Sequence, residues 1–327
     1  MARARKHLAL TAALLAGLVA AVWLVWAIGF DAVFAAIARA GIAGLGLLCL
    51  YALLLFVTLA FAWRSLLPPG QRLPLRDLYL ARLVRDSIAE ISPFSPVGGM
   101  VAAARLTILR GLDPAHAAAS VAGDATTEAM AQVAFLAFGV AMAALHFSGD
   151  ANAGPVLHAM IATLLLAVPG IAGLILLQKK GADFAGRIAA RFFAQVKDGV
   201  SFRQAIHELY DSPARLAASA SWHLLAWIGA GGATWLAFRL VGADIGLLDA
   251  LALEALLCTL RSIAAFVPAA LGVQEGGYAV LAQLFGLPAE IGLAVSLLKR
   301  AREIVLGVPA LIYWQAVESR TALRSAP

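Results

Sequence analysis

Charged residues are scarce in this chain of 327 residues, in which Asp, Glu, Lys and Arg make up 13%. A soluble globular protein carries about 25% charged residues. Half of that share does not cover the surface of a water-soluble fold of this length, so the composition excludes a soluble protein. Hydrophobic residues, by contrast, make up 62% of the chain. These proportions predict a single integral membrane domain whose apolar side chains face lipid.

Cysteine and histidine are also rare, with two and six residues respectively. Cys49 and Cys258 lie inside apolar runs, which argues against a disulfide framework and against a cysteine metal site. The histidines are scattered along the chain, and His223 is interpreted as a hydrogen-bonded helix contact rather than a ligand. The sequence also lacks an HExxH zinc motif, a P-loop and a nucleophile elbow. We therefore expect no metal, no cofactor and no enzymatic activity.

Long apolar runs predict an all-α polytopic membrane protein. A membrane-spanning helix needs about 20 mostly apolar residues. The segments that meet this requirement are 8–30, 42–63, 117–145, 155–177, 216–241 and 289–317. For the first run the alternative is a cleaved signal peptide, but the apolar core of such a peptide is only about 7–15 residues long. Asp113-Pro114 and Ser212-Pro213 each predict a helix N-cap followed by Pro at the first helical position.

Lys and Arg predict the orientation, because short cytoplasmic loops are enriched in them. Basic residues gather at the N-terminus, after the second span, in 178–215 and in the C-terminal tail. The loops expected on the opposite side, 31–41, 147–154 and 242–249, carry a single basic residue, Arg39. Both termini are therefore predicted to lie in the cytoplasm, with the protein in a bacterial inner membrane.

The longest polar stretch, 178–215, is predicted to link a first half, 1–177, to a second half, 216–327, of one membrane domain. Its apolar and basic residues alternate at helical spacing, which favours an amphipathic helix on the inner leaflet, followed by a short helix that starts near Ser201. Basic residues at such a surface attract anionic lipid. The alternative is an ordinary solvated linker that follows the positive-inside rule.

The segment 74–110 does not span cleanly and is predicted to be a hairpin that enters and leaves the membrane on the cytoplasmic side. It is helix-like to Ile91 and again after residue 99, but the intervening residues 92–99 hold two prolines and a glycine pair. Neither half is long or apolar enough to cross lipid alone. The arginines on both flanks belong to the cytoplasmic side.

The segment 248–287 is predicted to form the counterpart hairpin, which enters from outside. A helix runs to Val267, is broken over 268–277 by Pro and a second glycine pair, and resumes before Pro288. Broken helices at corresponding positions of two halves indicate the binding site of a transporter. The opposed directions make the repeat inverted. The alternative is that 248–267 is a full span and the likeness between the halves is accidental.

Charged residues at membrane depth predict where the site lies, because each costs about 2.5–3.5 kcal/mol even on lenient insertion scales. Two sets follow one another at i, i+4 and i+8, which places each set on one helix face. They are Arg82, Asp86 and Glu90, and Asp124, Glu128 and Gln132. Glu254 and Arg261 share a face of the second hairpin, and Lys299 and Glu303 form an i, i+4 pair. Internal pairing that holds the helices in register is the alternative, but buried ion pairs stabilise a protein less than apolar packing does.

A polar cavity that faces both hairpin breaks explains these charges together. The helix starts after the breaks and the nearby Arg and Lys side chains favour an anionic or phosphate-bearing headgroup. Asp124 and Glu128 are candidate proton carriers or ligands of a cationic or hydroxylated group. The predicted cavity residues are Arg85, Asp86, Glu90, Pro93, Pro96, Gly98, Gly99, Arg105, Asp124, Glu128, Glu254, Arg261, Pro268, Gly272, Glu275, Lys299, Arg300, Arg302 and Glu303.

Three stretches, RDSIAEISPFSPVGGMVAAARLTILRG (85–111), VPAALGVQEGG (267–277) and SLLKRAREI (296–304), resemble the membrane region of lysylphosphatidylglycerol synthase/flippase proteins. The likeness is greatest to the hopanoid-biosynthesis-associated proteins of that superfamily, the HpnL type, and covers nearly the whole chain. Met100 departs from the broad family, which usually has an acidic residue after the glycine pair. The resemblance implies lipid translocation, with hopanoids or another polycyclic or anionic lipid as cargo. Because the chain ends at Pro327, we expect no aminoacyl-transferase domain and no lysine transfer.

Two other functions stay open at the level of sequence. An accessory protein of a lipid-biosynthesis complex would bind its partners through the 178–215 surface. A membrane enzyme acting on a lipid headgroup would use Asp124, Glu128 or Glu275 as acid or base. Nucleic-acid binding has no support, because the basic residues follow the topology and form no patch with interleaved aromatic residues.

Overall fold

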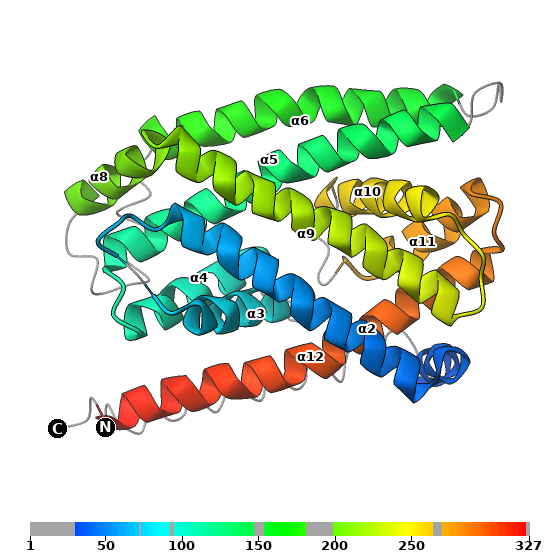
Figure 1. Cartoon of the computed structure of the whole chain (residues 1–327), viewed down its shortest axis with the longest axis horizontal. Helices are drawn as coiled ribbons and strands as arrows, with labels where there is room; N and C mark the ends of the chain where they lie inside the picture. Colours follow the sequence, from blue (N-terminus) through cyan, green and yellow to red (C-terminus); the bar gives the residue numbers. More distant parts are fainter. Residues whose placement is uncertain are drawn as a thin grey trace.

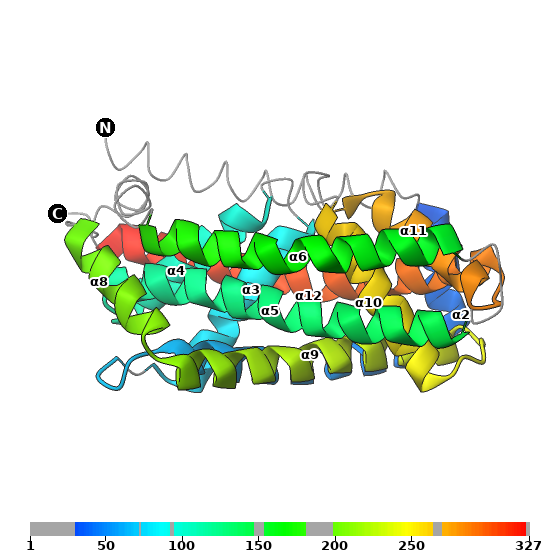
Figure 2. The same ribbon diagram turned by 90° about the horizontal axis from the view of Figure 1, so that it is seen from above.

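The computed structural model describes residues 30–71, 73–91, 95–146, 154–180, 199–263 and 270–324, and the regular structure in these residues is α-helical. The helices are α2 (Phe30–Leu66), α3 (Leu75–Ile91), α4 (Ser95–Leu109), α5 (Pro114–His146), α6 (Gly154–Lys180), α8 (Gly199–Tyr210), α9 (Pro213–Leu240), α10 (Leu247–Ile263), α11 (Val273–Leu284) and α12 (Ala289–Arg324). The long helices α5, α6, α9 and α12 run along the long dimension of the molecule (Figures 1 and 2). The predicted all-α class is confirmed.

Three helices of the described residues are long and apolar enough to cross a membrane: Ala38–Leu66, Pro114–His146 and Ile161–Lys180. They coincide with three predicted spans. Two further predicted spans coincide with α9 and α12, which have 28 and 36 residues but are less apolar. At 1.5 Å per residue these two helices are about 42 and 54 Å long. The remaining predicted span, 8–30, lies outside the described residues. The chain is therefore a multi-pass membrane protein.

The outer face of α6 is apolar, and no other part of the described chain covers it. Leu165, Leu166 and Leu177 are exposed, and none of the residues in the most apolar window of this helix is buried inside the protein. A soluble protein does not expose such a continuous apolar face to water. This face of α6 is therefore the surface that contacts lipid.

The segment 31–41 belongs to α2 and is not the loop that the sequence predicted. The helix runs from Phe30 to Leu66 and is interrupted at Gly41, where φ is +71°. Glycine adopts positive φ at little cost, so the chain changes direction there and continues as a helix. The prediction of a loop over 31–41 was wrong, because one glycine inside an apolar run kinks a helix without ending it.

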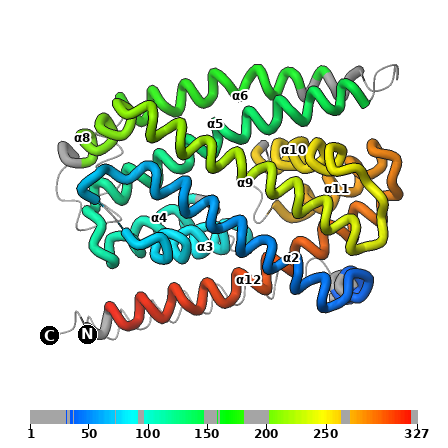
Figure 3. Tube along the Cα trace, viewed as in Figure 1, coloured from blue at the N-terminus to red at the C-terminus, as the bar shows by residue number. Residues whose placement is uncertain are grey.

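Four of the described links between helices lie at the two ends of the molecule (Figure 1). The α2–α3 link, the α4–α5 link and α8 lie at the end where α12 finishes (Figures 1 and 3). The α9–α10 and α11–α12 links lie at the opposite end (Figure 1). This division follows the distribution of Lys and Arg in the sequence. Which end faces the cytoplasm stays a prediction.

Two helix pairs, α3–α4 and α10–α11, lie toward opposite ends of the molecule (Figure 1). They coincide with the two predicted hairpins. Their glycine pairs, however, lie inside helices and not in the breaks, since α4 begins at Ser95 and α11 begins at Val273. The prediction that these glycines break the helices was wrong. Pro96 falls in the first turn of α4, where the missing N–H of proline is tolerated and the helix can start.

The glycines serve close packing between the two arms of each pair. A Cβ atom on Gly99 of α4 would overlap the backbone carbonyl oxygen of Arg85 in α3. A Cβ atom on Gly277 of α11 would lie 2.6 Å from a side-chain carbon of Leu257 in α10. The second glycine of each pair therefore lets one arm approach the other.

Of the two predicted N-cap residues, only Asp113 caps its helix through side-chain hydrogen bonds in the described structure. Asp113 Oδ1 accepts hydrogen bonds from the backbone N–H groups of Ala115 (3.0 Å) and His116 (3.1 Å) at the start of α5. Ser212 precedes α9 but makes no such side-chain bond in the described structure. Pro follows each of these residues as the first residue of the helix.

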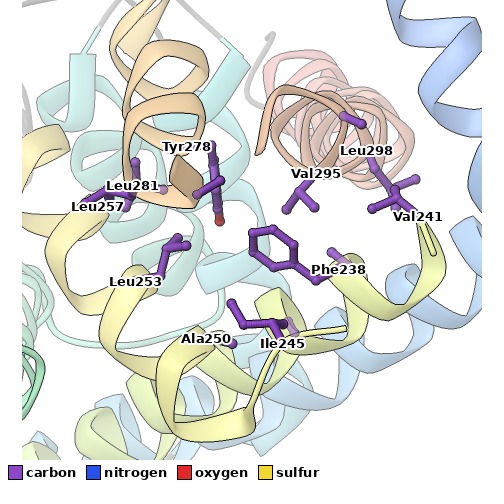
Figure 4. Close-up of a cluster of buried hydrophobic side chains, with 14 of the residues drawn as sticks. Phe238, Val241, Ile245, Ala250, Leu253, Leu257, Tyr278, Leu281, Val295 and Leu298 are labelled. Atoms are coloured by element: carbon purple, nitrogen blue, oxygen red, sulfur yellow. The ribbon is translucent and has the colours of Figure 1, made fainter. Parts of the chain in front are cut away.

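Each helix pair packs on its own hydrophobic cluster. The cluster around α3 and α4 includes Trp63, Leu78, Val84 and Leu106. The cluster around α10 and α11 includes Phe238, Val241, Ile245, Ala250, Leu253, Leu257, Tyr278, Leu281, Val295 and Leu298 (Figure 4). Full burial of one large apolar side chain contributes about 1.5–3 kcal/mol. Each helix pair therefore has its own cluster, and the long helices α2 and α12 contribute residues to both clusters.

The short helix expected near Ser201 is α8. Phe202 and Ile206 of α8 are buried against Ala115 and Ala119 of α5. The amphipathic helix predicted before it falls mainly on residues 181–198, which lie outside the described residues.

Candidate functional site

A cavity of about 640 Å³ lies between the two helix pairs. This volume is within the range of about 300–1,000 Å³ that is typical of small-molecule sites. Its polar lining comes mainly from α3, α5, α10 and α12. An apolar part of the lining comes from α2 and α9 and comprises Ala52, Leu55, Phe56, Leu59, Ala226, Trp227 and Ala230. The cavity therefore has both a polar and an apolar wall.

Nine of the nineteen predicted site residues line this cavity. They are Arg85, Asp86, Glu90, Glu128, Glu254, Arg261, Lys299, Arg302 and Glu303. With Arg82, the lining holds five cations and five carboxylates. The lining as a whole is therefore balanced in charge, and its preference for a ligand depends on which of these groups are already paired.

The largest group of paired charges, here called the arginine cluster, comprises Arg82, Arg85, Asp86, Asp124, Glu128 and His223. The Arg82 guanidinium donates to Asp86 (3.0 Å), Asp124 (2.5 Å) and Glu128 (2.7 Å). Arg85 donates to Asp124 and, at 2.9 Å, to Glu128. The i, i+4 spacing of Asp124 and Glu128 places both carboxylates on one face of α5, as the sequence predicted. In the structure this face lies opposite the two arginines of α3.

A second group centres on Glu254 of α10, whose carboxylate is buried. The Lys299 ammonium of α12 lies 2.9 Å from it, and the hydroxyls of Thr234 and Tyr278 donate to it at 2.6 and 2.7 Å. The pairing of Lys299 with Glu303, which the i, i+4 spacing suggested as an alternative, is therefore replaced by a pair with Glu254. Although the two residues are one helical turn apart, the lysine turns toward the carboxylate that α10 supplies from outside its own helix.

A third group joins α11 to α12. The Arg300 guanidinium lies 2.9 Å from Glu275 and 3.0 Å from Glu303, and Arg302 lies 3.5 Å from Glu303. Glu275 also accepts the backbone N–H of Gly272 at 2.8 Å, which caps the start of α11. Arg300, Glu275 and Gly272 therefore hold the second hairpin in place, beside the cavity rather than in its lining.

Two lining residues, Glu90 and Arg261, stand apart from these groups. Each is half-buried, and within the described residues neither has an oppositely charged group within 4 Å. They belong to the two different hairpins and face the same cavity. Arg261 is therefore a cation that the described side chains leave available to a ligand.

The comparison with known families gives a match over almost the whole chain. Residues 10–310 match the family model described as "Lysylphosphatidylglycerol synthase TM region". The chain belongs to this family. No curated protein and no solved structure matches it. Membership of the lysylphosphatidylglycerol synthase TM-region family makes the chain a membrane protein of a lipid-handling family.

The three stretches that resemble the lysylphosphatidylglycerol synthase TM region all border the cavity. The first contributes Met100 together with three charged residues, the second contributes Ala270, and the third contributes Lys299, Arg302 and Glu303. Met100, which stands where the broad family usually has an acidic residue, gives the lining an apolar side chain at that place. The family-like sequence is thus concentrated around the cavity.

Several predicted residues do not line the cavity. Arg105 pairs with Glu318 of α12 at 2.5 Å, and Asp124 is buried behind Arg82 within the arginine cluster. Gly98 and Gly99 lie in α4. Pro93 and Pro268 lie outside the described residues, and Pro96 is described only as part of the first turn of α4.

The predicted cavity residues did not include His223, Thr234 and Tyr278, three polar residues that complete the paired groups. His223 Nε2 lies 3.0 Å from Asp124, so the predicted helix contact is confirmed, but the histidine also lines the cavity. Its position as a lone titratable residue deep in an apolar span was a usable signal. Thr234 and Tyr278 carried no such signal, because hydroxyl groups are common in membrane helices.

Proposed function

We propose that this chain moves lipid between the two leaflets of a membrane by passing the headgroup through the central cavity, as a flippase does. The main support for the proposal is the lining of the cavity, which is charged on one side and apolar on the other. Charged side chains of α3, α5, α10 and α12 would hold a polar headgroup, and the apolar residues of α2 and α9 would accompany the start of the hydrocarbon tail. Charges at this depth are costly unless they serve a pathway or a partner.

The arrangement of the two helix pairs supports an alternating-access mechanism. The α3–α4 pair lies toward one end of the molecule and the α10–α11 pair toward the other (Figure 1), and both contribute charged residues to one cavity. In transporters built from inverted repeats, one repeat rocks against the other around a fixed site. Here each pair has its own hydrophobic cluster, so each could move as a unit.

The cargo in this proposal is a membrane lipid with an anionic headgroup or a polycyclic lipid of the hopanoid type. The protein would act in a bacterial inner membrane with both termini in the cytoplasm. No chemical step is proposed, so the lipid would leave in the form in which it entered. Arg261 has no carboxylate within 4 Å in the described part of the chain, and it favours a headgroup that carries an acidic oxygen, because guanidinium groups bind such oxygens strongly.

Leaflet exchange in liposomes tests the proposal. The purified chain is reconstituted with a fluorescently labelled phosphatidylglycerol, and the fraction of label that a membrane-impermeant quencher can reach is followed with time. We expect the wild-type chain to speed exchange and the Arg261→Ala variant to slow it. The matched control is Arg239→Ala, which removes an exposed ion pair with Asp244 far from the cavity. If the wild-type chain behaves like empty liposomes, the proposal fails.

Analysis of lipid extracts distinguishes transport from headgroup chemistry. A strain without the gene would keep the same lipid species if the chain only moves lipid. A lipid species that disappears or accumulates would instead support a membrane enzyme. An accessory role in a biosynthetic complex would be supported if the cavity variants behaved like the wild-type chain while changes on α8 abolished the capture of partner proteins.

A further inference from the structure

His223 of α9 is a buried histidine with one ring nitrogen unaccounted for. The residue is 0% exposed, and its Nε2 atom lies 3.0 Å from Asp124 Oδ1. Its Nδ1 atom is buried and has no hydrogen-bond partner within the described structure. The residue also lines the central cavity. A polar atom buried without a partner costs about 1–3 kcal/mol, so this atom calls for an explanation.

The position of the imidazole proton follows from the neighbours of Asp124. The other oxygen of Asp124, Oδ2, accepts hydrogen bonds from both Arg82 and Arg85, so the carboxylate is ionised and can only accept. Nε2 of His223 must therefore carry the proton that it shares with Asp124. In neutral histidine this assignment leaves Nδ1 as a bare lone pair.

The charges that face His223 come from two neighbouring helices. They are Arg82, Arg85 and Asp86 from α3, and Asp124 and Glu128 from α5. The two arginines and three carboxylates sum to one net negative charge. Six further charged residues face the same cavity and together carry no net charge: Glu90 of α3, Glu254 and Arg261 of α10, and Lys299, Arg302 and Glu303 of α12. The helix α2 contributes only apolar residues to the lining.

A proton on Nδ1 of His223 would make this cluster neutral. The imidazolium has two N–H donors: Nε2–H already has Asp124 as its acceptor, while Nδ1–H has none among the described side chains. An acceptor oxygen that enters the cavity would supply the missing partner.

We propose that His223 binds an acidic oxygen of the lipid headgroup through Nδ1–H and takes up one proton from water when that oxygen enters the cavity. When the headgroup leaves, Nδ1 returns the proton to water. The inference rests on the proposed lipid translocation and adds two points to it: the ligand is a lipid with an acidic headgroup, and its movement is coupled to a proton. Arg261 lies on another helix of the same cavity and supplies a permanent positive charge, whereas His223 supplies one that depends on pH.

The binding step is tested without any transport assay. The chain is labelled with ¹⁵N-histidine and placed in nanodiscs of phosphatidylcholine alone or of phosphatidylcholine with one quarter phosphatidylglycerol. The signal missing from His223→Gln identifies His223. We expect this signal to titrate at a higher pH in the discs that contain phosphatidylglycerol. His158, exposed on α6, reports the change in surface pH that anionic lipid causes, so the shift of His223 must exceed that of His158. Equal shifts would overturn the proposal.

The coupling step is tested by leaflet exchange of labelled phosphatidylglycerol at different pH values. In the wild-type chain we expect the exchange rate to fall about tenfold per pH unit above its midpoint, as for one titrating group. In His223→Gln the rate should no longer depend on pH, and in the control His158→Gln it should follow the wild-type profile. If His223→Gln keeps the wild-type profile and Glu90→Gln loses it, the proton is carried by Glu90 and the proposal is wrong.

The two experiments separate this inference from the proposed function. If the wild-type chain shows no exchange at any pH, lipid translocation fails, and the nanodisc titration still decides whether His223 binds an acidic headgroup. If exchange occurs but is independent of pH, translocation stands and the coupling through His223 is refuted.

Discussion

The ammonium of Lys299 lies 2.9 Å from the carboxylate of Glu254, and both side chains are only 5% exposed. Removal of one member of a buried ion pair costs about 3–5 kcal/mol, because the other charge stays buried alone. We therefore expect Lys299→Met to lower the free energy of unfolding by that amount. The double variant Lys299→Met/Glu254→Leu should recover most of the loss. Unfolding in detergent micelles, followed by circular dichroism, measures both effects.

The exposed pair of Arg239 and Asp244 provides the comparison for this experiment. The two side chains are largely exposed, so solvent screens their attraction, and Arg239→Ala should leave unfolding almost unchanged. A Lys299→Met variant as stable as the wild-type chain would mean that the buried pair does not support the fold.

The arginine cluster shows how much of the site the sequence could predict. Asp124 and Glu128 lie one helical turn apart, and this spacing alone places them on one face of α5. The sequence also placed Arg82 on a common face with Asp86. It did not specify that these two faces meet, because that contact depends on how α3 packs against its neighbours. The sequence therefore predicted the members of the cluster and left their pairing open.

The two errors at the candidate site have a common physical cause. Lys299 was paired with Glu303 because the two residues are neighbours on one helix, but its partner comes from α10, 45 residues earlier in the chain. The glycine pairs were assigned to the breaks because glycine disfavours helices, but Gly99 lies in α4 where the backbone of α3 approaches closely. Rules based on residues that are close in sequence failed for the partner of Lys299 and for the position of the glycine pairs, because contacts between different helices determine both.

Gly99 and Gly276 should respond in opposite ways to alanine. A Cβ atom on Gly99 would overlap the backbone carbonyl of Arg85, which cannot move without separating α3 from α4. Such overpacking costs about 1–3 kcal/mol. A Cβ atom on Gly276 meets no atom within 4 Å, and alanine in a helix is more favourable than glycine by about 1 kcal/mol. We expect Gly99→Ala to lower the unfolding midpoint and Gly276→Ala to raise it or leave it unchanged.

The capping residue Asp113 should give the stability a dependence on pH. Burial raises the pKa of this carboxyl, but hydrogen bonds from His116 and Ala115 lower it further than burial raises it, so the net pKa lies below its usual value. A lowered folded pKa contributes stability above the unfolded pKa of about 3.9, and this contribution is lost as the pH falls through the folded value. Acidification should therefore destabilise the wild-type chain at this position.

Asp113→Asn isolates this effect, because asparagine also caps a helix but carries no charge. We expect the wild-type chain to unfold at a higher temperature than Asp113→Asn at pH 5, and the difference to shrink toward pH 3. A difference that is constant between pH 5 and pH 3 would show that the Asp113 charge contributes nothing to stability.

Arg261 and Arg300 should separate function from stability. Arg300 is fully buried and holds Glu275 and Glu303 at 2.9 and 3.0 Å, so Arg300→Gln should lower the free energy of unfolding by about 3–5 kcal/mol. Arg261 is half-buried and has no carboxylate within 4 Å among the described residues, so Arg261→Gln should leave unfolding almost unchanged. Its exchange of labelled phosphatidylglycerol should nevertheless fall about tenfold, which corresponds to about 1.4 kcal/mol of lost interaction with the headgroup. If instead Arg261→Gln unfolds as readily as Arg300→Gln, the Arg261 guanidinium stabilises the folded protein without a ligand. In that case the guanidinium is already paired within the protein and is not available to bind a headgroup.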